Sequence, residues 1–426
     1  KIMNKNPNLE IRELVLSVIN NIIQLRHSNI MSGWKIIFSV YSAAANDTSR
    51  TLNNASFNAM SKLIQDHWEL VYPNFVDIIN CFASFAKNTS ITSNTEENTT
   101  TTKNNNNNGN NNNNNNNSEN ENENSNTSLS AIKQILRLTQ KLVEGTNDIR
   151  CDEHGSLLSI EQQEQQKLLE MENKAATETE SSSKYRFTDS ADHSRVWFPI
   201  LTCLARLIVD QRKDIRRSSL FGLFEILNFS GSDFSPSLWE LIFKGVLFPI
   251  FNDVTHSEEG ESDRFIKEWL DTTCQDALNL LVGLFETKER YVTLSFLLND
   301  VMHLVRTCIV HPNKLLARKG VVCLQQLLVD SGHFFPEQVW NQVCDNMSSL
   351  LKSTTPQELM DSKIIHDNAL QASIHEENGT NAVVQPTLPF SPSKVLAKCI
   401  VQLELVGVVD KIVQKHWSSF TGYVFK

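Results

Sequence analysis

Apolar residues recur at spacings of three and four along most of this chain, which is the period of an amphipathic helix. Leu14, Ile19 and Ile22 follow this spacing near the start of the chain. Ser32-Gly33 and Pro73 interrupt it, as residues that end helices do. Between residues 9 and 86 the pattern predicts four helices in two hairpins: Leu9–Leu25, Trp34–Ala44, Thr51–Asp66 and Tyr72–Ala86.

The chain also repeats itself. Residues 217–239 match residues 318–340 at a constant offset of 101 residues, since 318 − 217 = 101. In both copies an arginine opens an apolar run, Ser-Gly ends it, and an aromatic residue and a tryptophan follow. Such self-similarity is typical of stacked helical arrays, and sustained strand-like alternation is missing from the sequence. We therefore predict an all-α fold, a HEAT/armadillo-like helical-repeat solenoid interrupted by disordered linkers.

Polar segments separate the groups of predicted helices. The asparagine-rich stretch is too poor in apolar residues to offset the entropy lost on ordering, so we expect it to be disordered. Residues 161–174 read as a polar helix. The predicted organisation is helical repeats at 9–86, an Asn-rich disordered insert at 88–128, a helix plus polar linker at 129–194, helical repeats at 195–352, a polar linker at 354–390 and a C-terminal helix at 391–417.

Composition narrows the class of protein. A chain of 426 residues exceeds what one core usually fills, which suits a solenoid. A formal net charge of -10 argues against nucleic acid as a partner. The eight cysteines form no CxxC pair, which is typical of reduced core thiols, and no apolar run reaches the roughly 18 to 20 residues of a membrane helix. The chain starts with lysine and becomes helical almost at once, so we expect an internal segment of a longer protein.

Motifs for catalysis or cofactor binding are missing from the sequence. GxxxxGK, GxGxxG, GxSxG and HExxH do not occur. Cys151 and His154 have a metal-like spacing but supply at most two of the four ligands that structural zinc needs. The sequence predicts no catalytic residue, no cofactor and no metal site.

Tryptophans stand at or near several predicted helix starts. Trp34, Trp197 and Trp239 are examples. An indole at such a place either covers the junction of a hairpin or contacts a partner, and the sequence leaves both roles open.

Several strings resemble a known family. They are IRELVLSVINNII with SGWKIIFSVYSAAA (11–45), RVWFPILTCLARLIVDQRKDIRRSSLFGLFEIL (195–227), WELIFKGVLFPIFND (239–253) and KCIVQLELVGVVDKIV (398–413). Together they resemble the C-terminal "homology downstream" region of large brefeldin-A-inhibited guanine-nucleotide exchange factors for Arf GTPases. Ser32-Gly33-Trp34-Lys35 and the string from Arg195 to Leu201 are the most specific pieces. We therefore take Trp34, Lys35, Arg195 and Trp197 as candidate partner-binding residues.

The resemblance implies a function. It implies a non-catalytic regulatory scaffold in vesicle trafficking, cytoplasmic and peripheral at trans-Golgi or endosomal membranes, with control of membrane recruitment, autoinhibition or dimerisation. The partners that it implies are Arf-family or Arf-like small GTPases and a second copy of the chain, with membrane association through partners. The family's exchange domain carries a catalytic glutamate, and no stretch here matches that domain. The alternatives are a generic HEAT-repeat adaptor, such as a transport receptor, and an enzyme with an unrecognised site.

Overall fold

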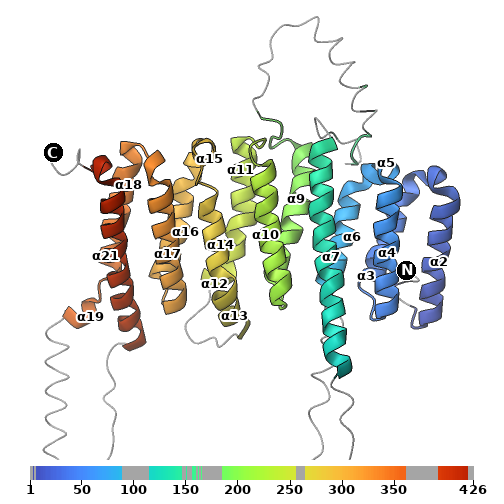
Figure 1. Ribbon diagram of the computed structural model, residues 1–426, viewed down its shortest axis with the longest axis horizontal. Coiled ribbons are helices and arrows are strands. Elements are labelled where there is room, and N and C mark those ends of the chain that lie inside the picture. The colour runs from blue at the N-terminus through green and yellow to red at the C-terminus, as the bar shows by residue number, and fades with distance from the viewer. Residues whose placement is uncertain are drawn as a thin grey trace, which may run out of the picture. The chain divides into compact units, whose positions relative to one another are not determined.

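The computed structural model describes residues 6–88, 115–145, 156–159, 185–255, 264–360 and 392–420, together with Met3, Arg150, Gln162 and Gln165. Within these residues the named elements are all helical, and Phe187 and Phe234 form an isolated parallel bridge. The prediction of an all-α fold is thereby confirmed. Two compact units, Lys1–Ile250 and Phe251–Lys426, are described in turn (Figure 1).

The first unit begins with the predicted hairpins. Their helices are α2 (Leu9–Arg26), α3 (Trp34–Ala45), α4 (Arg50–Asp66), the short α5 (Trp68–Val71) and α6 (Phe75–Lys87). Local caps explain where the helices start: the Asn8 side chain accepts a hydrogen bond from the Glu10 backbone N–H, and the Ser49 hydroxyl accepts one from that of Leu52. The four helices expected here agree with α2, α3, α4 and α6 to within three residues.

Helix α7 (Asn115–Gly145) corrects one boundary. The sequence predicts a disordered insert through residue 128 and a helix from Leu129, whereas the helix begins at Asn115. Ala131, Ile132 and Ile135 are fully buried and anchor it. Once a helix is anchored, adding a residue costs far less than nucleation, so the helix continues into polar sequence. Residues 89–114, most of the predicted polar helix at 161–174, and residues 361–391 lie outside the described residues.

The first unit continues with α9 (Ala191–Leu207), α10 (Lys213–Ser230), α11 (Pro236–Ile242), a π-helical turn η4 (Phe243–Leu247) and the start of a 3-10 turn η5 (Phe248–Phe251). The sequence expects this block to start near Arg195, but α9 starts four residues earlier because the Ser190 hydroxyl caps it. Phe187 lies before the helix and is fully buried, and its ring centroid is 5.2 Å from that of Trp197. A short aromatic anchor therefore belongs to the core although its flanks look like linker.

Arg212 joins three segments of the first unit. Its guanidinium pairs with both carboxylate oxygens of Asp210 at 2.9 Å, donates to the Ala86 carbonyl at the end of α6 and donates to the Ser128 hydroxyl on α7, the last two at 2.8 Å. Asp210 also accepts from the Arg212 backbone N–H, which shapes the turn before α10. Arg216, fully buried, donates to the Asp210 and Gln211 carbonyls of that turn. Side chains thus satisfy backbone groups that the helix ends leave open.

The second unit is built in the same way. It contains α12 (Asn252–Thr255), α13 (Arg264–Thr272), α14 (Cys274–Gly283), α15 (Lys288–Leu294), the 3-10 turn η6 (Ser295–Leu297), α16 (Leu298–Val310), α17 (Lys314–Ser331), the turn η7 (Gly332–Phe334), α18 (Glu337–Thr354), α19 (Gln357–Met360) and α21 (Pro392–Phe420). The last of these contains the predicted C-terminal helix at 391–417 except for Ser391.

The sequence repeat corresponds to two helical hairpins with the same internal geometry. Helix α10 spans Lys213–Ser230 and α17 spans Lys314–Ser331, so both ends keep the offset of 101, since 314 − 213 = 101 and 331 − 230 = 101. After each, a phenylalanine packs on the tryptophan that follows it: the ring centroids of Phe234 and Trp239 are 5.4 Å apart, and those of Phe335 and Trp340 are 5.5 Å apart. The repeated sequence therefore encodes the same local structure twice: a long helix followed by a phenylalanine that packs on a tryptophan.

Helix α21 docks on α17 in parallel. Arg318 pairs with Glu404 at 2.6 Å, Gln325 accepts from Lys411 at 2.8 Å, and Lys415 lies 3.5 Å from Asp330. These contacts follow the same order along both helices. Val401, Leu405 and Val408 are buried beneath them. Apolar packing therefore holds α21 while the polar pairs set its register.

Among the residues that the structure describes, one segment has the length and composition of a membrane span. It is the 23-residue stretch Lys288–Val310, of which the most apolar window is 44% buried. The sequence reasoning did not single it out, because its apolar run is interrupted. The stretch is divided by the turn η6, and α16 packs against α17 through buried residues such as Val305 and Cys308. These features are those of a core helix.

Removal of Arg212 should destabilise the first unit. Arg212→Ala leaves the carboxylate of Asp210, whose side chain is 5% exposed, without its ion pair, and we expect a loss of about 2 to 4 kcal/mol in unfolding free energy. Lys244→Ala is the control, because the Lys244–Glu240 pair is exposed and its loss should change that free energy by less than about 0.5 kcal/mol. Urea unfolding followed by tryptophan fluorescence checks both values, and equal effects would contradict this account of Arg212.

Replacing two glycines of the second unit with alanine should change the unfolding free energy in opposite directions. A Cβ at Gly320 would lie 2.9 Å from Ile309 Cγ1 and 3.0 Å from the Ile309 backbone nitrogen, whereas a Cβ at Gly407 would meet nothing within 4 Å. Gly320→Ala should therefore destabilise by about 1 to 3 kcal/mol, despite its better helix propensity. Gly407→Ala should stabilise by about 0.5 to 1 kcal/mol. Thermal melting of the two variants beside the parent chain gives both signs.

Candidate partner-binding surface

The four candidate residues fall into a buried pair and an exposed pair. Trp34 begins α3 and Trp197 lies within α9, and both indoles are buried. Lys35 and Arg195, close to them in sequence, are exposed. The sequence left open whether the tryptophans pack inside the protein or contact a partner, and both are packed inside. Of the four candidates, Lys35 and Arg195 are the two that are accessible to a partner.

Packing explains the position of each indole. The Trp34 ring stacks on Phe38 one turn further along α3, with centroids 6.2 Å apart. Trp197 is in contact with Phe187 and with Phe234, whose centroid lies 4.7 Å away. These aromatic contacts hold the start of α3 and the turn between α10 and α11, so the tryptophans position the surface instead of forming it.

The exposed cations differ in their surroundings. Lys35 lies near Asp77 of α6; burial raises the pKa of the Asp77 carboxyl, and the charge of Lys35 partly offsets that effect. Arg195 follows the first turn of α9 and is exposed beside the buried Val196. Both residues are positively charged, whereas the chain as a whole is acidic. Each lies on a helix directly beside a buried residue, Lys35 after Trp34 and Arg195 before Val196, so its backbone position is fixed by the core.

A cavity of about 270 Å³ lies among α2, α3 and α4, and its lining combines apolar surface with several polar side chains. The rings of His27 and His67 stack on each other in this lining with centroids 4.2 Å apart, and the Tyr41 hydroxyl donates to Asn20 Oδ1 at 2.7 Å. Burial raises the pKa of Tyr41 well above its ordinary value, so this phenol stays protonated and acts as a donor. Two stacked imidazoles present their faces to each other, which is not the arrangement of two ligands on one metal ion.

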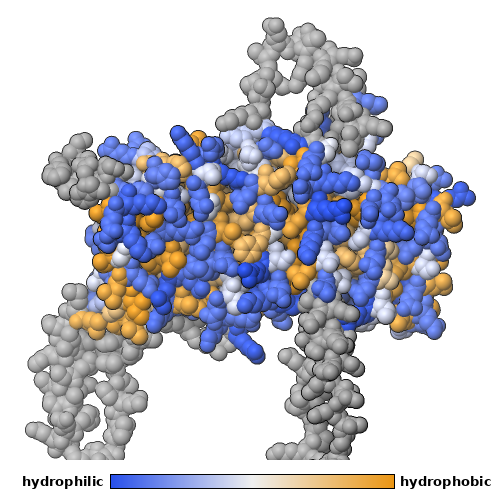
Figure 2. Space-filling model, viewed as in Figure 1, coloured by the Kyte–Doolittle hydropathy of each residue, from blue (hydrophilic) through white to orange (hydrophobic). Residues whose placement is uncertain are grey.

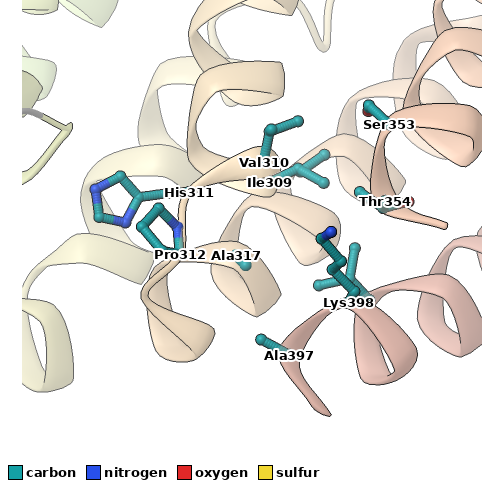
Figure 3. A pocket seen from close by; sticks show the side chains of 10 residues that line it. Ile309, Val310, His311, Pro312, Ala317, Ser353, Thr354, Ala397 and Lys398 are labelled. Carbon is teal, nitrogen blue, oxygen red and sulfur yellow. The ribbon is translucent and has the colours of Figure 1, made fainter. Parts of the chain in front are cut away.

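A smaller cavity of about 120 Å³ lies in the second unit (Figure 3). It is lined by the end of α16, the start of α17, the end of α18 and the start of α21, mainly through Ile309, Ala317, Ala397 and Val401. The Thr354 hydroxyl at its edge donates to the Leu350 carbonyl at 2.7 Å. The cavity therefore offers apolar side chains and few free polar groups, as expected where helix ends pack imperfectly.

The pKa values of several buried thiols are raised. Burial raises the pKa of Cys81, Cys203 and Cys308 to about 12 each, so these thiols stay protonated at neutral pH. The cysteines that the structure describes are free thiols, and among its described residues no group of three or more histidine, cysteine or acidic side chains can hold a metal ion. Cys151 and His154, the metal-like pair of the sequence, lie outside the described residues.

Sequence reasoning missed a second surface. Five large aliphatic side chains on the outer side of α2 are between 40% and 77% exposed: Ile11, Leu14, Val18, Ile22 and Leu25. Figure 2 shows hydrophobic residues at the surface where α2 lies. We call these five residues the α2 stripe. Its signal was present in the sequence, because α2 has apolar residues on two faces and a helix at the edge of a hairpin needs only one.

Comparison with known proteins gives the relatives of this chain. Residues 1–62 match the family model described as Mon2/Sec7/BIG1-like, HDS. Brefeldin A-inhibited guanine nucleotide-exchange protein 3 of Arabidopsis thaliana is 29% identical over 397 residues, which cover 89% of this chain and 20% of the relative. Protein 1 of the same name from Bos taurus is 24% identical over 458 residues, covering 97% of this chain and 21% of the relative. No solved structure matches.

A fungal relative extends the agreement. The ADP-ribosylation factor guanine nucleotide-exchange factor sec72 of Schizosaccharomyces pombe is 24% identical over 440 residues, which cover 97% of this chain and 20% of the relative. The chain thus spans about a fifth of the length of the curated relatives it matches. The resemblance predicted from the sequence is confirmed as a similarity: along 89% to 97% of its length the chain is similar to part of large guanine nucleotide-exchange proteins, and residues 1–62 match a model of the downstream homology region.

Proposed function

We propose that this chain is a non-catalytic regulatory scaffold segment of a large Arf guanine-nucleotide exchange factor. The similarity to such factors along 89% to 97% of the chain is the observation that supports the proposal most strongly. In this proposal exchange is carried out by another part of the parent protein, and the segment controls membrane recruitment, autoinhibition or dimerisation.

The described residues support a role in protein binding. Stacked helical hairpins present long surfaces to other macromolecules, and that is the usual work of such folds. The two cavities offer neither a nucleophile with a base nor a set of metal ligands. Lys35 and Arg195 are exposed cations at fixed positions, which suits recognition of an acidic patch on a partner.

The partner in this proposal is an Arf-family or Arf-like GTPase in its GTP-bound state. Recruitment through such a partner would place the segment at trans-Golgi or endosomal membranes as a peripheral component. A net charge of -10 weakens direct attraction to anionic lipid, so a membrane-bound protein is a better docking site than the lipid surface itself.

Flotation with liposomes tests the recruitment form of the proposal. We expect residues 1–426 to float with liposomes that carry a GTP-loaded Arf GTPase and to stay in solution with the GDP-loaded form. The double variant Lys35→Glu and Arg195→Glu should lower the bound fraction about tenfold, equivalent to about 1.4 kcal/mol of binding free energy. Lys213→Glu with Lys244→Glu is the matched control, since it makes the same change of charge at other exposed lysines.

Two results would contradict this proposal in different ways. Absence of flotation with every GTPase tried would exclude recruitment by the segment. Equal loss of binding in both double variants would show that overall charge, and not the two candidate positions, controls the interaction. Nucleotide exchange by the parent protein with and without residues 1–426 then separates autoinhibition from recruitment, because only autoinhibition predicts faster exchange in solution after deletion.

A further inference from the structure

The α2 stripe is a regular apolar surface without a partner among the described residues. At about 100° per residue, Ile11, Leu14, Val18, Ile22 and Leu25 lie within about 80° of one another on the helix. With a rise of about 1.5 Å per residue the stripe is about 21 Å long. Each of its side chains is at least 40% exposed. Single exposed aliphatic residues are ordinary, but five in register along one helix face mark a contact surface.

The stripe is separate from the face that already packs. Leu16 and Ile23 are the buried residues of α2 and lie about 150° from the centre of the stripe. Arg12 belongs to the packed side too, because its side chain, 11% exposed, pairs with Asp47 in the turn before α4 at 2.7 Å. The helix therefore has one apolar face against α3 and α4 and a second apolar face that is open.

The charges beside the stripe argue against a lipid surface as its partner. Helices that lie on membranes carry lysine and arginine on their polar face. The polar face of α2 instead carries Glu10, Glu13, Ser17, Asn20 and Gln24. Of the two arginines of α2, Arg12 is paired with Asp47, and Arg26 in the last turn is exposed. A long, narrow, apolar stripe with two glutamates and a single exposed arginine on the same helix suits an amphipathic protein helix better than an anionic lipid surface.

The chain itself shows how such a face is covered. Helix α21 lies parallel to α17, with buried aliphatic residues between them and polar pairs at the edges. On its other side α21 has an exposed apolar row of its own, with Leu396, Leu403 and Val406 each more than half exposed. Open apolar faces thus occur on the first and the last long helices of the described chain, which is typical of stacks that continue without capping repeats.

We propose that the α2 stripe binds an amphipathic helix from the part of the same polypeptide that lies beyond this segment. The curated relatives are about five times as long as their match to this chain, so such proteins have ample sequence to supply that helix. The helix would contribute aliphatic residues at spacings of three and four, and would fix the orientation of this segment relative to the rest of the protein. This inference rests on the proposed function in one respect, that the chain is a segment of a longer protein, and it does not depend on recruitment by a GTPase.

A second copy of the chain is the main alternative occupant. The stripe is symmetric about Val18, because its successive spacings are three, four, four and three residues, so two stripes could pair in antiparallel. The solution mass of residues 1–426 decides between the two occupants. We expect a monomer for the parent chain and for Val18→Asp, and a dimer that Val18→Asp dissociates would overturn the proposal.

Hydrogen exchange in the full-length protein tests the occupant directly. Amides of residues 9–26 should exchange at least about tenfold more slowly in the full-length protein than in residues 1–426. Val18→Asp should abolish that difference without changing exchange in residues 1–426, where Val18 faces solvent. Ser17→Asp, on the polar face, is the control and should leave the protection intact. Equal exchange in the two chains, or protection that Val18→Asp does not affect, would overturn the proposal.

Discussion

Each long helix of a stack of hairpins has to be apolar on more than one side, because it packs against its hairpin partner and against the next hairpin. In the second unit α17 meets this requirement: it contacts α14, α16 and α21 and carries buried residues from Leu316 to Leu328. The requirement explains why close approach is built in at Gly320, where a Cβ would collide with α16. It also explains why a helix that lacks one neighbour, such as α2, is left with an apolar face in solvent.

Polar side chains complete this packing at the turns. In the first unit, Asp47 and Asp210 each accept a hydrogen bond from a backbone N–H two residues later, and in the second unit the His311 ring accepts one from Asn313. An arginine pairs with each aspartate: Arg12 of α2 pairs with Asp47, and Arg212, the residue before α10, pairs with Asp210. These contacts add less free energy than apolar burial, but they satisfy backbone groups at helix ends and so decide where each helix begins.

Sequence patterns predicted helices well because helical periodicity and caps are local. The hairpins before Lys87 and the repeated unit at an offset of 101 residues were predictable, since several helix ends carry a local Ser, Asn or Gly signal, such as Ser49 before α4, Gly231 after α10 and Asn313 before α17. The start of α7 was not, because the energy that extends it comes from anchoring residues beyond Thr127 and not from the asparagines. Phe187 was also missed, because it is an isolated aromatic residue in a polar stretch of sequence. Its role in the core is visible only from its contacts with Trp197 and Phe234 in the folded structure.

The same distinction between local and distant information limits what could be predicted about the surface. The strings around Trp34 and Trp197 resemble those of a family, but such a resemblance does not say which residues of a string are exposed to solvent. Here the indoles are buried and the charged residues beside them are exposed, so the specificity of the sequence comes largely from packing. Exposure of the α2 stripe depends on which neighbours a helix has in space. The fold shows that the stripe is exposed, and the greater length of the relatives supplies the sequence that could cover it. The stripe is therefore where packing inside this segment would continue into the rest of a longer protein.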